Sequence, residues 1–176
     1  MPSELEKPGL LQPSPSQPDA DSRRPADIYL PTWTSGKPAA LDVAITSPTT
    51  SDVLPLAGTR AGAAAASYEE AKRTHLDTAA DCLRQGMSFI PIVAEPSGGL
   101  GASAACTLKA LARAGAVRTG RSPEALWLEF RRRWSTTLRR SAARAVLARM
   151  PEEAIATSAP WVAAGHAVAY AADAWQ

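Results

Sequence analysis

The sequence has little cysteine and little histidine, which excludes most zinc chemistry. Its two cysteines, Cys82 and Cys106, lie far apart without a CxxC pair, and only His75 and His166 could join them. A structural zinc site needs four ligands in closely spaced pairs, so none is expected. We predict instead that both cysteines are small buried residues of helices, and that His75 lies on or near the surface of a helix. Two isolated histidines indicate no Ser–His–Asp arrangement.

Long apolar runs are also missing. No run approaches the roughly 20 residues that cross a bilayer. The first residues, MPSELEKPG, carry acids and prolines where a secretory signal would need an apolar region. We therefore expect an intracellular protein that has no membrane partner.

Lysine is scarce and arginine is common, although the formal net charge is only +2. Many arginines fall between Arg113 and Arg149, whereas the acids are spread through the first half of the chain. This distribution fits a basic surface on the C-terminal part. It equally fits the codon bias of a GC-rich genome.

Composition divides the chain into three parts. Residues 1–24 are rich in Pro, Ser, Gln and Asp, which predicts a disordered tail because such a segment buries too little apolar surface to offset its ordering entropy. Residues 25–120 are expected to form an α/β core, and residues 121–176 an arginine-rich helical extension. The predicted fold class is α/β, with a small mixed sheet flanked by helices.

Hydrophobic periodicity places the elements within these parts. A hairpin-like turn should join the first two strands, and Pro91 should place the third at a sheet edge or a bulge because it donates no ladder hydrogen bond. The expected strands are 26–31, 39–46 and 88–95, and the expected helices are 59–85, 102–114, 123–150 and 160–175.

Two acids and one lysine form the strongest candidate for chemistry. Asp27 opens the first strand, and Asp42 lies in the second on the face opposite Leu41. Paired as a hairpin, the strands would bring both carboxylates to one end of the sheet. A carboxylate among apolar strand residues is costly unless a partner such as a divalent cation compensates it. Lys72 falls on the apolar stripe of the predicted helix that includes Tyr68, which would direct it toward the sheet.

Two acids that hold a metal beside a lysine suit phosphodiester cleavage, with the lysine stabilising charge in the transition state. The same residues also admit a structural interpretation. Asp27 could begin a strand, Asp42 could accept a backbone hydrogen bond, and Lys72 could extend along the surface to solvent. Spacing alone leaves both interpretations open.

Three stretches resemble a known family: RRPADIYLPTWTSGKPAALDVAITSP, YEEAKRTHLDTAADCLRQGMSFIPIVAEPSGG and LRRSAARAVLAR. They look like the restriction-like endonuclease segment at the C-terminal end of non-LTR retrotransposon polyproteins, downstream of the reverse transcriptase. In the similar PD-(D/E)xK pattern, a proline–acid pair starts one strand and a second acid lies on the next, two residues before a lysine. Here Ala26 replaces the proline and Ala44 the lysine, and the N-terminal tail replaces the first helix and strand.

The resemblance implies a metal-dependent DNA endonuclease of a retroelement polyprotein that works in the nucleus beside a reverse transcriptase. Asp27 and Asp42 would bind Mg²⁺ or Mn²⁺, and the catalytic lysine would be Lys72 in place of the strand lysine.

Glu95, at the end of the third strand, would be an extra metal ligand or, as the sequence favours, a solvated acid. Glu69 is expected on a solvated stripe with Arg73.

The helix at 123–150 combines an apolar stripe with many arginines. Ser122 is its expected N-cap, and the stripe runs from Leu126 to Val146. Guanidinium groups suit a phosphate backbone, although a solvated face or a membrane-surface helix has the same composition. The predicted nucleic-acid contacts are Arg131, Arg132, Arg133, Arg139, Arg140 and Arg144.

Two other functions remain open at this point. The chain could be a catalytically inactive, nucleic-acid-binding remnant of such a nuclease, an interpretation favoured by the missing strand lysine. It could also be a protein-interaction domain without a nucleic-acid role.

Overall fold

The computed structural model describes residues 3–7, 9–11 and 26–150. The chain forms two compact units, Met1–Glu129 and Phe130–Gln176. The division falls within the last described helix, α5 (Pro123–Leu147), a few residues beyond the predicted start of the helical extension. The first unit is a mixed α/β structure and carries all the candidate acids.

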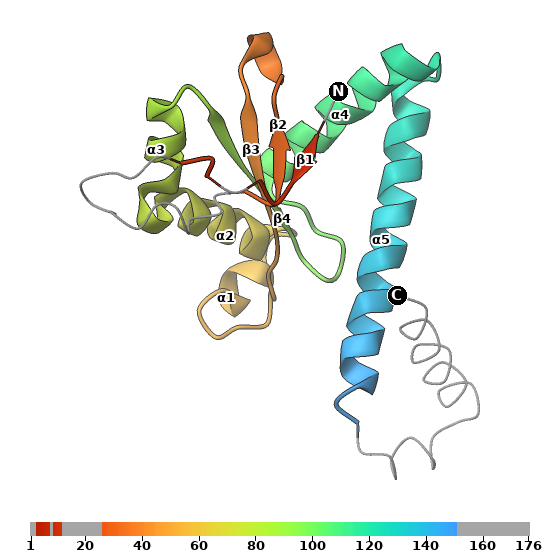
Figure 1. Ribbon diagram of the computed structural model, residues 1–176. Coiled ribbons are helices and arrows are strands. Elements are labelled where there is room, and N and C mark those ends of the chain that lie inside the picture. Colours follow the sequence, from red (N-terminus) through yellow and green to blue (C-terminus); the bar gives the residue numbers. More distant parts are fainter. Residues whose placement is uncertain (1–2, 8, 12–25, 151–176) are drawn as a thin grey trace. The chain divides into compact units, whose positions relative to one another are not determined.

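An open sheet of four strands forms the centre of the first unit (Figure 1). Neighbouring strands are antiparallel except for the last pair, β3 and β4, which is parallel. In sheet order the strands are β1 (Glu4–Leu5), β2 (Ile28–Leu30), β3 (Ala39–Ile45) and β4 (Ser88–Ala94). The predicted hairpin and third strand are confirmed. Within the described sheet β4 is an edge strand, as Pro91 predicted.

Helices connect and cover these strands. A parallel pair needs a crossover connection, and here helices supply it between β3 and β4. The described α-helices are α1 (Leu54–Ala57), α2 (Ala63–Thr74), α3 (Thr78–Arg84), α4 (Ala102–Thr119) and α5. Short 3₁₀ turns lie at Thr34–Gly36, in the hairpin, and at His75–Asp77, between α2 and α3.

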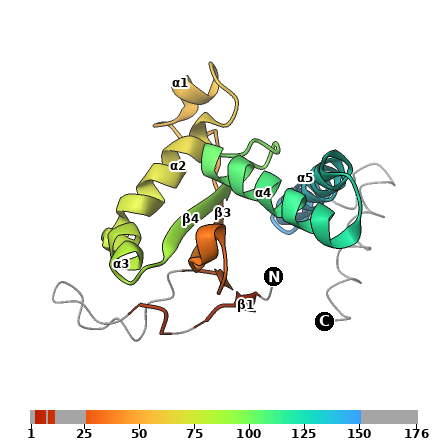
Figure 2. The ribbon, with the colours of Figure 1, turned by 90° about the horizontal axis from the view of Figure 1, so that it is seen from above.

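The two faces of the sheet are covered by different helices, as the views from the side and from above show (Figures 1 and 2). On one face, Leu41 of β3 and Ile92 of β4 pack with Ala104 of α4. On the other face, Ala40 of β3 packs with Cys82 of α3. Alternation along β3 therefore directs Leu41 toward α4, and directs its neighbours Ala40 and Asp42 toward α2 and α3.

Part of the N-terminal segment differs from the predicted disordered tail. Glu4–Leu5 pairs with β2, and Leu10 and Leu11 are buried against Ala26 and Cys82. Two adjacent leucines supply enough apolar surface to anchor a segment whose average composition is polar. The segment thus adds a first strand to the sheet. Residues 12–25 lie outside the described residues.

The single helix predicted over 59–85 is wrong. The chain instead turns at Gly62, forms α2, and breaks at Leu76 and Asp77, which both adopt left-handed backbone angles with φ of 51° and 52°. A straight helix would keep one face toward the sheet. The break reorients the chain so that Thr78, Asp81 and Cys82 of α3 are buried.

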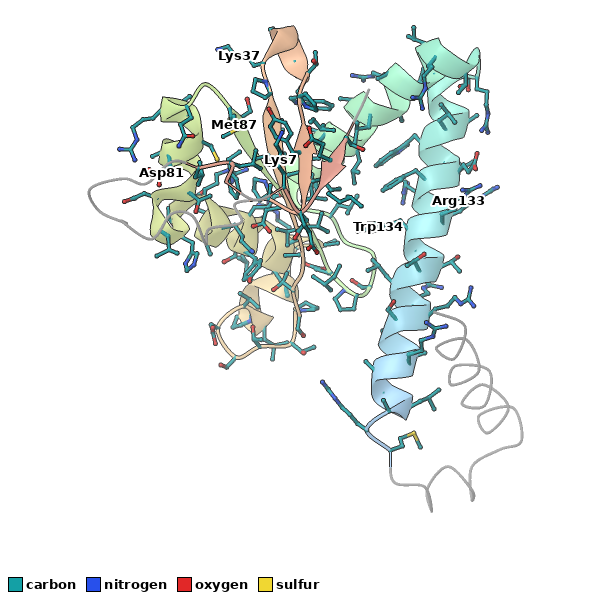
Figure 3. All side chains as sticks on the ribbon, viewed as in Figure 1. Lys7, Lys37, Asp81, Met87, Arg133 and Trp134 are labelled. Atoms are coloured by element: carbon teal, nitrogen blue, oxygen red, sulfur yellow. The ribbon has the colours of Figure 1, made fainter. Side chains whose placement is uncertain are left out.

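Helix α5 begins as predicted, because the Ser122 hydroxyl accepts a hydrogen bond of 3.0 Å from the Ala125 N–H. In the second unit, the rings of Phe130 and Trp134 stack with centroids 5.7 Å apart. Figure 3 shows Arg133 and Trp134 leaving the helix on different sides. The predicted stripe ends early, since Val146 is 61% exposed.

No helix in the described part of the chain is long and apolar enough to cross a bilayer. The helix predicted over 160–175 lies outside the described residues.

Candidate active site

The β2–β3 hairpin brings Asp27 and Asp42 together. Ile28 is the first residue of β2 and pairs with Leu41 of β3, so Asp27 comes just beyond the ladder, beside Leu41 and its neighbour Asp42. The Asp27 N–H donates to the Leu41 carbonyl at 3.0 Å, and the Val43 N–H donates to Asp27 Oδ2 at 2.7 Å. The Asp27 carboxylate thus extends the ladder beyond the end of β2, beside the backbone that carries Asp42.

Lys72 of α2 completes the group. Its Nζ lies 2.9 Å from Asp42 Oδ2, and the two side chains are only 27% and 18% exposed. Partial burial by itself lowers the pKa of the Lys72 ammonium. The hydrogen bond and charge of Asp42, followed by Tyr68 and Asp27, outweigh that effect and raise this pKa above its ordinary value of 10.5. Lys72 is therefore a cation at neutral pH, held against Asp42.

This raised pKa makes a testable prediction about stability in the metal-free protein. A cation whose pKa is raised by folding stabilises the native state fully below its unfolded pKa of 10.5, and loses that effect as pH rises through the folded pKa. Lys72→Gln should therefore unfold at lower urea than the wild type at pH 8, and the difference should shrink above pH 10.5. A difference that is unchanged or grows at high pH would contradict the ion pair.

The predicted orientation of Lys72 is correct, but the stripe that predicted it is not. Tyr68, Leu76 and Leu83 are 39%, 51% and 74% exposed, so this stripe does not face the sheet. The buried face of α2 consists of small alanines at its start and of Glu69. Tyr68 instead lies beside the lysine, with Nζ 5.8 Å from the ring centroid. His75, exposed as predicted, joins Tyr68 and Lys72 around a hollow of about 160 Å³.

The donor set of this group, two carboxylates without histidine or cysteine, suits a hard cation such as Mg²⁺ or Mn²⁺ rather than zinc. The described residues contain no cluster of three or more His, Cys, Asp or Glu side chains that could hold an ion. Two carboxylates, Asp27 and Asp42, are nevertheless the usual protein contribution to Mg²⁺, whose remaining ligands are waters and substrate phosphates. A cation held by this pair would therefore take its remaining ligands from water and from a phosphate substrate.

Glu95 is neither a solvated acid nor part of this group. It is 5% exposed, and its Oε1 accepts a hydrogen bond of 3.3 Å from the Ala65 N–H at the start of α2. The unpaired N–H groups and dipole of a helix N-terminus stabilise a carboxylate there. Glu95 therefore fixes the end of β4 to the beginning of α2, and is not available as a metal ligand beside Asp42.

The prediction that Glu69 lies on a solvated stripe is wrong. Its side chain is 3% exposed, and its carboxylate accepts hydrogen bonds from the Ser103 and Ala104 N–H groups at 3.1 and 3.0 Å. Glu69 thus caps α4 from α2 and holds both helices in place around the sheet. The alanine run that starts α2 was the missed signal, because Glu69 follows buried Ala65 by four residues and shares its face.

The cysteine prediction holds for one residue only. Cys82 is fully buried in α3, whereas Cys106 is exposed on α4.

A larger, apolar hollow of about 600 Å³ lies on the α4 side of the sheet, lined in part by Ile28, Leu41 and Leu111. None of the three candidate catalytic residues lines it, so the polar group and the apolar hollow belong to opposite faces.

The predicted nucleic-acid contacts on α5 are mostly accessible. Arg144 is half-buried, and the exposed members are Arg131, Arg132, Arg133, Arg139 and Arg140.

Comparisons with protein-family models, with curated proteins and with solved structures found no match to this chain.

Proposed function

We propose that the chain is a metal-dependent DNA endonuclease module of the restriction-like class, whose catalytic group is Asp27, Asp42 and Lys72. The observation that carries the proposal is the 2.9 Å ion pair between Lys72 and Asp42, beside Asp27 at the end of the β2–β3 hairpin. The order of strands and helices supports it, since the second acid follows the first across a hairpin and a helix then crosses to a parallel strand.

Each residue has a distinct role in this proposal. Asp27 and Asp42 would hold Mg²⁺ or Mn²⁺, which supplies neutralisation of the phosphate charge and activation of water. Lys72 keeps Asp42 paired when no metal is bound, and its positive charge is then available to the phosphate once the carboxylate binds the cation. The raised pKa of Lys72 suits charge stabilisation and makes it a poor general base at neutral pH.

Nicking of supercoiled plasmid tests the proposal directly. The full chain should convert supercoiled to open-circular DNA in Mg²⁺ or Mn²⁺, and chelation by EDTA should stop the reaction. Asp52→Asn makes the same chemical change at an exposed aspartate outside the site, so this variant should nick at the wild-type rate. Absence of nicking in both metals, with DNA binding intact, would refute the nuclease and leave the binding remnant.

A nucleic-acid-binding role without catalysis is the second candidate, and the exposed arginines of α5 favour it. Neutralising a phosphate releases counterion, so about four contacts should give a slope of about −3.6 in log K against log salt. Replacing Arg132, Arg139 and Arg140 by alanine should flatten the slope by up to about 0.9 for each lost contact.

The same three positions provide the control for that experiment. Lysine at all three keeps the charge and should preserve the slope, whereas alanine should weaken binding to every sequence about equally. A slope that alanine leaves unchanged would show that this face of α5 is only solvated.

A further inference from the structure

Helix α4 and the first turns of α5, up to Glu129, form a short helical hairpin that lies within the first unit. Gly120, with φ of 68°, ends α4, and Ser122 caps α5 two residues later. Arg121 Nη2 lies 2.8 Å from Glu129 Oε2 across the turn. The ends of the two helices near the turn are therefore held in a fixed arrangement.

A hollow of about 220 Å³ lies in this hairpin and combines an indole with two cations. Lys109 Nζ is 5.8 Å from the Trp127 ring centroid, and Arg113 follows Lys109 by one helical turn. Lys109 and Arg113 are exposed, whereas Trp127 is half-buried and so is held by the helices. The complete lining is Lys109, Ala112, Arg113, Pro123, Glu124 and Trp127.

We propose that this hollow binds one unpaired nucleobase of a single strand, stacked on Trp127 with its phosphate between Lys109 and Arg113. Every base has a π-face, so an indole provides sequence-tolerant stacking, and basic side chains beside it follow the backbone. Glu124, which also lines the hollow, offers a hydrogen-bond acceptor to a base N–H. The choice of a nucleic-acid ligand rests on the proposed function, since a nick leaves a strand end that can unpair from its complement.

Other ligands fit the lining less well. An apolar molecule would take two cations out of water without giving them a partner, which costs free energy. A simple anion would use Lys109 and Arg113 and leave the indole without a role. A nucleotide uses both the aromatic surface and the positive charges.

Binding of labelled single-stranded oligo(dT), measured by fluorescence anisotropy in EDTA, tests the inference. Trp127→Ala should raise the dissociation constant about 5- to 100-fold, from the loss of one stacked base. Trp127→Phe should restore most of the affinity. For an oligonucleotide of abasic sites, wild type and Trp127→Ala should bind equally, since no base is present to stack.

Substitutions at two exposed residues of the hollow show whether weaker binding comes from lost contacts with DNA and not from misfolding. Lys109→Ala and Arg113→Ala should weaken binding of both the oligo(dT) and the abasic strand, because they act on the phosphate. Oligo(dT) affinity unchanged in Trp127→Ala, or lost equally for the abasic strand, would overturn the inference. Nicking is measured separately in Mn²⁺. A protein that does not nick but still loses oligo(dT) affinity in Trp127→Ala would refute only the nuclease. A protein that nicks but binds oligo(dT) equally well in Trp127→Ala would refute only this base-binding site.

Discussion

Replacing Asp42 by asparagine should slow metal-dependent nicking by about 10³-fold or more. The change keeps the size of the side chain but removes one of the two negative charges that would hold the cation. Metal stabilisation of the reacting phosphate is worth several kcal/mol, and each 1.4 kcal/mol is a factor of ten in rate. The measurement is the initial rate of open-circle formation at saturating Mn²⁺.

Asp42→Asn also breaks the ion pair with Lys72, so folding must be checked beside the rate. Circular dichroism should be unchanged, because Asp42 lies on a strand whose ladder hydrogen bonds are made by the backbone. The exposed Asp52→Asn serves again as the control. Wild-type nicking by Asp42→Asn would remove this residue from the catalytic group.

Replacing Glu69 by alanine should cost about 3–5 kcal/mol of unfolding free energy. The variant leaves the part-buried N–H of Ser103 and the buried N–H of Ala104 without an acceptor, at about 1–3 kcal/mol each, and opens a cavity beside them. Urea unfolding followed by circular dichroism measures the loss.

The neighbouring residue provides a matched control. Glu70 is 69% exposed and its contact with Arg73 is at the surface, so Glu70→Ala should change stability by less than about 0.5 kcal/mol. Glu69→Gln keeps an acceptor oxygen and should fall between the two. Equal stability of Glu69→Ala and Glu70→Ala would contradict the capping role.

The sheet was predictable because its signals are local. Alternation in AALDVAIT defines β3, and the short connection after Leu30 leaves only a hairpin, so the pairing of β2 with β3, which brings Asp27 near Asp42, follows from the sequence. Pro91 marked the edge strand for the same reason, since an absent N–H donor is a property of one residue. The cap of α5 at Ser122 is also a local pattern.

The errors arose where tertiary contacts decide the structure. Leu76 and Asp77 carry no glycine or proline, so nothing in the sequence marked the left-handed break that divides α2 from α3. Glu69 next to Arg73 matches a solvated pair, and only the arrival of the α4 N-terminus turns it into a buried cap. The prediction that Lys72 points toward the sheet is correct, because its side chain contacts Asp42 of β3. The large apolar residues from which that prediction was made are exposed.

Titration of Mn²⁺ into the protein with a bound, non-cleavable DNA analogue, followed by calorimetry, tests the proposed metal site most directly. The proposed site predicts saturable binding in the wild type that is lost in the double variant Asp27→Asn/Asp42→Asn and kept in Asp52→Asn. Binding that is equal in the wild type and the double variant, or absent from both, would contradict a metal site at the end of the β2–β3 hairpin.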